Sequence, residues 1–125
     1  MIDTSEALRD YLLTVPALAA ARFYAERDTP PPNYKPADGW AFCFKRRGGG
    51  QHYEGVILEP SYQFKCYGAT ELAANQAYRA LYDALDGMAE YLLQAAEMET
   101  QGQTLYEPKT NWPYVLVFFK FSVLN

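Results

Sequence analysis

The stretch "YQFKCYGATELAANQAYRALYDALDG", residues Tyr62–Gly87, changes its hydrophobic rhythm in the middle. Its first six residues alternate large apolar side chains with polar ones, which is the period of a half-buried β-strand. From Thr70 onward, small apolar residues recur at intervals of three and four, which is the period of an amphipathic helix. The stretch therefore predicts a strand that passes into a helix with almost no loop between them.

The predicted helix has a contact face that is rich in alanine. Its apolar positions are Leu72, Ala73, Ala77, Ala80, Leu81, Ala84 and Leu85. Its polar side carries Glu71, Asn75, Arg79 and Asp83. Alanines let the helix approach the sheet closely while the leucines fill the gaps, and Asp86-Gly87 ends the helix.

Two strands are predicted before this helix. "GWAFCFKRR" alternates Trp40, Phe42 and Phe44 with smaller or polar residues, and "GGGQH" follows as a flexible hairpin tip. The next strand, "EGVILEPSYQFKCYG", places Val56, Leu58, Tyr62, Phe64 and Cys66 on one face. Pro60 interrupts its hydrogen-bond ladder, so we expect this strand to lie at an edge or to carry a bulge there.

The N-terminal part predicts a short helix, a strand and a long loop. Ser5–Thr14 has helical spacing with Thr4 or Ser5 as its cap, and Pro16 ends it. This interpretation is preferred to a secretory signal segment, because acidic residues stand where a basic region would be. Ala21–Arg27 alternates as a strand, and the proline-rich residues 28–38 predict an extended, polyproline-like surface loop.

The C-terminal part predicts the last two strands. Met88–Gln101 is compatible with a helix by composition, but a strand is favoured because the final strand needs a hairpin partner. "YVLVFFKFSVL" is β-branched and aromatic, and it is apolar on both faces from Val115 to Phe119. Such a strand is covered on both faces, either by a helix and a neighbouring sheet or by another subunit. Because the chain predicts only one long amphipathic helix and one short one, a second cover from outside the chain is one of the two expectations.

The predicted fold is thus a single α+β domain over residues 1–125 with a mainly antiparallel β-sheet. A short N-terminal helix precedes three strands, one long helix packs across the sheet, and two strands follow. A chain of 125 residues is about one domain in length, and half of its residues are hydrophobic. Its longest uncharged apolar stretches are shorter than the roughly 20 residues that a membrane-spanning helix needs.

Charge and cysteine content narrow the possible functions. The net charge is −4 and the pI is near 4.9, so a general affinity for nucleic acid is not expected. Cys43 and Cys66 are the only cysteines; buried free thiols are favoured over a cross-strand pair.

Catalytic signatures are absent from the sequence. His52 is the only histidine, and it stands next to a glycine run at a predicted loop tip. "RRGGGQH" lacks the lysine and Ser/Thr of a phosphate-binding loop, and the pattern G-x-S-x-G does not occur. We therefore expect a protein that is not an enzyme and that needs no cofactor or metal.

Eleven tyrosines offer large, partly polar side chains of the kind that is enriched at protein interfaces. Tyr78 and Tyr82 are one helical turn apart and flank the apolar stripe of the long helix. They either contact a partner or cover the rim of the core, and the sequence leaves both possibilities open.

The order of elements resembles that of the small tail-terminator and minor capsid proteins, which join head to tail in long-tailed bacteriophages. The likeness rests on "TSEALRDYLLTVPAL", on "YQFKCYGATELAANQAYRALYDALDG" and on "GQTLYEPKTNWPYVLVFFKFSVL", and it covers nearly the whole chain. These segments match as patterns and carry no catalytic signature.

The resemblance implies a virion structural protein that is made in the host bacterial cytoplasm. Family members form a ring, usually a hexamer, that ends the tail tube and docks on the neck of the filled head. It implies contacts with further copies of itself, with a tail-tube protein and with a neck or head-completion protein, while DNA passes through the lumen without specific binding.

The residues expected to serve these contacts fall into two groups. Subunit or partner contacts are assigned to the loop Pro30–Pro36 and to Tyr78, Tyr82, Pro31, Tyr34, Pro60 and Tyr114. Contact with the lumen or with a partner ring is assigned to Arg46, Arg47 and His52.

Three alternatives stay open. Other head–tail connectors, neck proteins and minor capsid proteins are also small ring-formers with mixed α/β folds. A small cytoplasmic binding module could use the aromatic face of the sheet to hold a ligand or a peptide. An enzyme whose site is completed between subunits is the third alternative.

Overall fold

The computed structural model describes residues 3–52, 57–86, 88 and 93–124. The helices are α1 (Thr4–Leu13) and α2 (Glu71–Leu85), with short 3-10 turns at Pro16–Leu18 and Pro36–Asp38. The strands are β1 (Arg22–Ala25), β2 (Ala41–His52), β3 (Ile57–Tyr67), β4 (Leu93–Tyr106) and β5 (Pro113–Leu124). The predicted α+β fold and its order of elements are confirmed, including the strand assignment for Leu93–Gln101.

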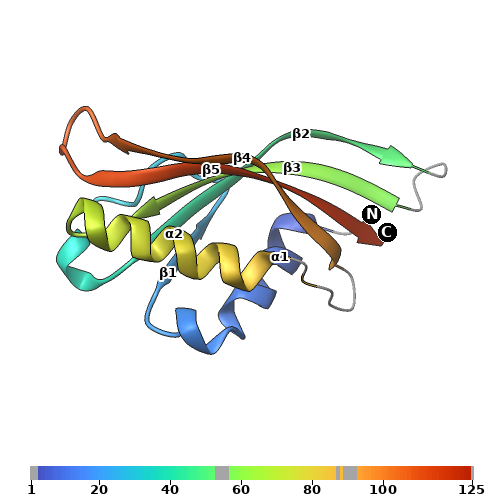
Figure 1. Cartoon of the computed structure of the whole chain (residues 1–125), viewed down its shortest axis with the longest axis horizontal. Coiled ribbons are helices and arrows are strands. Elements are labelled where there is room, and N and C mark those ends of the chain that lie inside the picture. The colour runs from blue at the N-terminus through green and yellow to red at the C-terminus, as the bar shows by residue number, and fades with distance from the viewer. Residues whose placement is uncertain (1–2, 53–56, 87, 89–92, 125) are drawn as a thin grey trace.

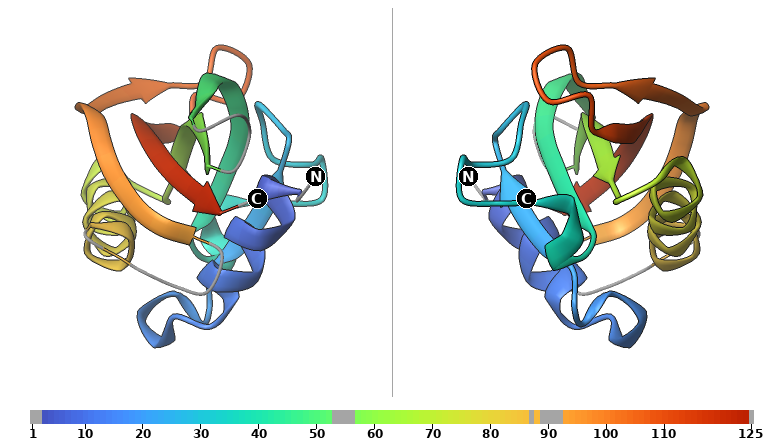
Figure 2. Two further views of the ribbon diagram at one scale, coloured as in Figure 1. Left: turned by 90° about the vertical axis from the view of Figure 1, so that its right-hand side faces the viewer. Right: turned by 90° about the vertical axis from the view of Figure 1, so that its left-hand side faces the viewer.

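The five strands form one twisted sheet in the order β1-β2-β3-β5-β4 (Figure 1). β1 runs parallel to β2, and the other neighbouring strands are antiparallel. Both helices cover the same face of the sheet, below it in Figure 1. The end-on views of Figure 2 show α2 and α1 as separate helices, and α2 contacts β4 whereas α1 contacts β1.

Helix α2 packs on the sheet through small side chains, as its alanine-rich face predicts. Its buried residues are Ala74, Ala77, Leu81 and Leu85. The predicted face was wrong at its start, because Leu72 is 67% exposed and Ala74 is buried in its place. Ala74 is one turn before Ala77 and so continues the buried stripe, whereas Leu72 lies to one side of it.

The joint between β3 and α2 is as short as the sequence predicts. Gly68 follows the last residue of β3, and the Thr70 side chain accepts a hydrogen bond from the Ala73 amide as the helix cap. A Cβ atom at Gly68 would lie 2.4 Å from the Ala74 nitrogen. The backbone of the first helical turn therefore packs directly on the glycine, which explains how the chain reverses without a longer loop.

The central hairpin differs from its prediction in two ways. The residues "GGGQH" are part of β2, because glycine without a side chain can still pair in an antiparallel ladder. Pro60 is buried in β3, which lies inside the sheet and not at an edge. The irregularity lies in β2 instead, where the register shifts between Arg46 and Gly48, opposite Tyr62 and Ser61, and where Gly48 adopts a φ of +131°.

The N-terminal helix has a different cap from the predicted one. The Asp3 side chain accepts a hydrogen bond from the Glu6 amide, whereas Thr4 and Ser5 are buried inside the first turn. The Ser5 hydroxyl lies 2.7 Å from the Tyr62 hydroxyl and also bonds to the Glu26 carboxylate. Ser5 therefore ties α1 to the sheet and is not free to act as a helix cap.

The second face of the sheet is covered at one end by the chain itself. Tyr34 of the proline-rich loop is fully buried in a cluster with Ala41, Cys43, Tyr67 and Tyr114. The cover that was expected from outside the chain therefore comes from residues 28–38 over this part of the sheet. The prediction of a surface loop missed this because prolines mark where a chain cannot pair, but not what it covers.

The two cysteines are buried free thiols on opposite faces of the sheet. Cys66 belongs to the core beneath the helices and Cys43 to the cluster around Tyr34. Burial raises the pKa of the Cys43 thiol to about 12 and also raises the pKa of the Cys66 thiol. Both thiols are thus protonated and unreactive at neutral pH.

Candidate interaction surfaces

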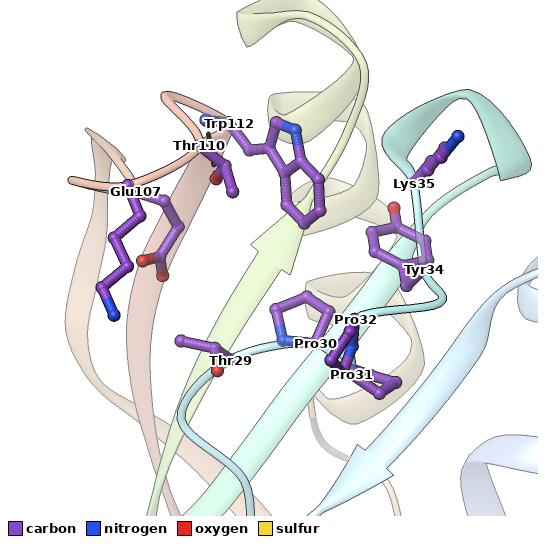
Figure 3. A pocket seen from close by; sticks show the side chains of 10 residues that line it. Thr29, Pro30, Pro31, Pro32, Tyr34, Lys35, Glu107, Thr110 and Trp112 are labelled. Carbon is purple, nitrogen blue, oxygen red and sulfur yellow. Dashed lines mark hydrogen bonds between the residues drawn. The ribbon is translucent and has the colours of Figure 1, made fainter.

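A groove of about 340 Å³ lies between the proline-rich loop and the turn that joins β4 to β5 (Figure 3). Its apolar walls are formed by Pro30, Pro31, Pro32, Tyr34 and Trp112. We call this feature the proline–tryptophan groove. Figure 3 shows the Trp112 indole pointing between Tyr34 and Pro30, so rigid rings line the groove from both segments.

Tyr34 fixes the proline-rich wall of the groove. Its amide donates to the Pro31 carbonyl at 3.0 Å, and its hydroxyl donates to the Gly39 carbonyl at 2.5 Å. Its ring meets the Trp112 ring edge-on, with 5.8 Å between centroids. Burial raises the pKa of Tyr34 to about 12, so its hydroxyl remains a donor at neutral pH.

The β4–β5 turn holds the opposite wall. The Glu107 amide donates to the Trp112 carbonyl at 2.9 Å, and the Asn111 amide donates to the Glu107 carbonyl at 2.8 Å. Asn111 has a φ of +59°, a conformation that asparagine adopts more readily than most residues. Trp112 is therefore positioned by a closed turn and not by a free loop.

The Glu107 carboxylate in the lining of the groove is paired with side chains of the sheet. The Glu107 carboxylate accepts a hydrogen bond from the Tyr67 hydroxyl and lies 3.5 Å from the Lys65 ammonium. That ammonium also lies 5.0 Å from the centroid of the Tyr114 ring. Burial and the bond to Glu107 raise the pKa of Tyr67. The negative charge of Glu107 is thus compensated from within the sheet.

Lys35 and Lys109 are the two lysines in the lining of the groove. Both are exposed, and among the residues that the structure describes neither ammonium group has an ion-pair partner. The groove therefore combines apolar walls with a rim of net positive charge, although the whole chain carries a net charge of −4.

A second surface lies on α2 around the predicted residues Tyr78 and Tyr82. Both rings are half-buried and pack against the core. The Gly102 amide donates to the Tyr78 hydroxyl at 3.2 Å, and a Cβ atom at Gly102 would lie 2.8 Å from the Tyr78 ring. Tyr78 and Tyr82 also line a shallow depression of about 390 Å³ together with Arg79, Asp83 and Met98.

A third surface is the basic part of β2. Arg46 and Arg47 are exposed, and the Arg47 guanidinium donates to the Gln63 side chain at 2.8 Å. His52 is the last residue of β2, and its side chain lies outside the described residues. Only the far end of the β2–β3 hairpin, where Ile57 pairs with Leu124, is remote from the proline–tryptophan groove near Tyr67. Arg46 pairs with Tyr62 midway along β3, and the Gln63 side chain that Arg47 contacts also donates to Asp28 at the start of the proline-rich loop.

The remaining predicted interface residues lie in different surroundings. Tyr34 and Tyr114 are buried in the cluster on the second face, and Pro60 is buried in β3. Pro31 is half-buried in the wall of the groove. Trp112 and Lys109 were not selected from the sequence, although a tryptophan beside a proline in a polar turn could have indicated an exposed aromatic wall.

The described part of the chain has neither a metal-binding cluster nor a membrane-spanning helix. That part of the chain contains no group of three or more His, Cys, Asp or Glu side chains that could hold a metal ion. None of its helices is long and apolar enough to cross a membrane.

These features define an α+β domain with a five-stranded, mainly antiparallel sheet, two helices on one face and a proline-rich loop on the other. The fold is similar to that of a chain in the solved structure described as "Virion of native gene transfer agent (GTA) particle". The TM-score is 0.64 at 14% sequence identity, and the alignment covers 94% of this chain and 92% of that chain. No protein-family model matches the sequence, and no curated protein matches it.

Proposed function

We propose that this chain is a structural protein of a phage-like virion, where it forms a ring at the head–tail junction. In this role the ring ends the tail tube and docks it to the neck. The observation that carries the proposal is the likeness in fold, over nearly the full length of both chains, to a chain of a gene transfer agent virion. The resemblance of the sequence to tail-terminator proteins supports the head–tail junction over other places in a virion.

The arrangement of the surfaces supports a joining role. Between the Tyr67–Tyr114 pair and the Ile57–Leu124 pair, β3 spans ten residue steps, or about 33 Å. The turn between β4 and β5, which carries one wall of the groove, lies at one end of the sheet, and the far ends of the paired strands β2 and β3 lie at the other (Figure 1). One chain can therefore contact different partners at its two ends, while its neighbours in a ring contact its sides.

The charges suit a lumen through which DNA passes without being held. Ion pairs join Lys45 to Asp28 at 3.0 Å and Lys120 to Glu59 at 3.6 Å, and Lys65 is paired with Glu107. Arg46 and Arg47 are exposed, and we propose that they face a partner ring or the lumen.

Electron microscopy of the purified protein with a tail-tube protein from the same source tests this function. We expect rings of uniform diameter from the chain alone and tubes that carry one ring at the end and stop growing. Tubes of unlimited length without end rings, together with single particles of the size of one chain, would overturn the proposal.

The groove favours a second candidate function, that of a small non-enzymatic binding module. Such a module would remain a monomer and would show a higher melting temperature with its ligand, because a ligand that binds only the folded state stabilises it. Another connector or neck protein would also form rings, but those rings would bind the neck and leave tube growth unchanged.

A further inference from the structure

The rim of the proline–tryptophan groove carries positive charge that no carboxylate of the described residues neutralises. Of its charged side chains, Glu107 is engaged by Tyr67 and Lys65, whereas Lys35 and Lys109 are exposed and lack an ion-pair partner among the described residues. Asp38 is nearby, but its carboxylate accepts the Lys35 amide at 3.2 Å as part of the loop. An occupant of the groove would therefore meet two available ammonium groups.

The walls of the groove are apolar and rigid. Three successive prolines each hold φ fixed, and the Tyr34 amide donates to the Pro31 carbonyl. Tyr34 is itself held by its ring contact with Trp112 and its bond to the Gly39 carbonyl. Trp112 supplies the facing ring from a closed turn. Such pre-organised walls lose little conformational entropy when they bind a ligand. The whole groove has a volume of about 340 Å³, which leaves room for aliphatic or proline side chains against these rings.

We propose that the proline–tryptophan groove binds an extended acidic peptide in which aliphatic or proline side chains lie between carboxylates. The apolar side chains enter between Trp112 and the prolines, and the flanking carboxylates pair with Lys35 and Lys109. The binding site lies within one chain and does not depend on ring formation. It therefore goes beyond the proposed function by giving the chemistry of one partner.

The test uses three fluorescein-labelled heptapeptides and fluorescence anisotropy. The first is Glu-Glu-Leu-Pro-Leu-Glu-Glu, the second has lysine in place of each glutamate, and the third has Ser-Gly-Ser in place of Leu-Pro-Leu. We expect saturable binding of the first peptide and at least about tenfold weaker binding of the other two, because charge and apolar contact both contribute. Equal binding of all three, or no binding of the first, would overturn the proposal.

Variants separate the groove from other surfaces. Lys35→Glu combined with Lys109→Glu should weaken binding of the acidic peptide about tenfold and create binding of the lysine peptide. Trp112→Ala should weaken binding of both the acidic peptide and the lysine peptide. The melting curve of this variant shows whether it is folded. Arg9→Glu, an exposed reversal on α1, is the matched control and should leave binding unchanged. Equal losses in the control and in the lysine variant would contradict the assignment to the groove.

Discussion

At the scale of single residues, Gly68 makes the sharp turn between β3 and α2 possible. A Cβ atom there would lie 2.4 Å from the Ala74 nitrogen and 2.6 Å from the Ala73 carbonyl carbon, and both are backbone atoms that cannot rotate away. The strand and the helix can be joined this closely only because residue 68 has no side chain.

Gly68→Ala should therefore lower the free energy of unfolding by about 3 kcal/mol or more, since the helix must shift off the sheet. Urea denaturation measures the change. Ala69→Ser, at the exposed neighbouring position, is the control and should change stability by less than about 0.5 kcal/mol. A change at Gly68 as small as that of the control would show that the joint is not tightly packed.

Tyr34 links stability to alkaline pH. Burial raises its pKa from 10.0 in the unfolded chain to about 12 in the folded one. Above pH 10 the unfolded state releases this proton first, so the stabilisation present below pH 10 is lost as pH rises towards 12.

Tyr34→Phe should reduce the loss of stability between pH 10 and 12, at a cost near neutral pH of about 1 kcal/mol for the lost bond to Gly39. Urea denaturation at a series of pH values compares the two proteins. Parallel declines would show that the Tyr34 hydroxyl does not contribute to the alkaline transition.

The sequence predicts the direction of side chains along a strand but not the burial of single residues in a loop. Alternation along Tyr62–Tyr67 predicts a strand because side-chain direction there follows from the backbone alone. The burial of Tyr34 depends on where a loop without regular hydrogen bonding folds back, and no local pattern encodes that. The groove was missed for the same reason, because Trp112 and the prolines are far apart in the sequence and meet only in the folded chain.

At the scale of elements, the spacing of apolar residues predicts helix α2 but not every residue of its buried face. The period gave the helix and most of its buried face, but it assigned Leu72 to that face instead of Ala74. Ala74 lies in line with Ala77 and Leu81 on the buried side, and its backbone packs on Gly68, whereas Leu72 points away from that side.

Leu81→Ala should accordingly cost about 2–5 kcal/mol, because Leu81 is fully buried between α2 and the sheet. Leu72→Ala is the matched substitution on the exposed side and should stay within about 0.5 kcal/mol. Thermal or urea unfolding of the pair gives the comparison. Similar losses in both variants would show that Leu72 is also buried against something, such as a second copy of the chain.

The β2–β3 hairpin shows what periodicity leaves out. The flexibility of glycine predicts a hairpin tip at "GGGQH". In the structure these residues pair with β3 beyond the bulge, and the backbone hydrogen bonds of that pairing outweigh the flexibility of glycine. Pro60 was expected at an edge, yet it lies in the middle strand, where the pairing of β3 with β5 is interrupted between Leu58 and Ser61. The order of strands in the sheet follows from long-range pairing, which a single sequence does not reveal.

At the scale of the whole molecule, the charge arrangement bears on contact with DNA. The lysines of the second sheet face have carboxylate partners, and the chain as a whole carries a net charge of −4. Counterion release from DNA requires clustered cations that are free to pair with phosphates.

Duplex DNA should therefore show no binding to the isolated protein at about 0.15 M salt in a polarisation titration. Any weak binding at low salt should depend on Arg46 and Arg47, and the variant Arg46→Ala with Arg47→Ala should abolish it. Tight binding that persists at high salt would contradict a passive lumen.

The central claim is that the chain works as a ring at the end of a tail tube. The most direct test is the mass in solution by multi-angle light scattering over a concentration series, alone and mixed with a tail-tube protein from the same source. We predict a discrete species several times heavier than the 14.2 kDa chain, or a defined mixed complex that stops tube growth. A strict monomer at every concentration that leaves the tube protein free to polymerise would contradict the account.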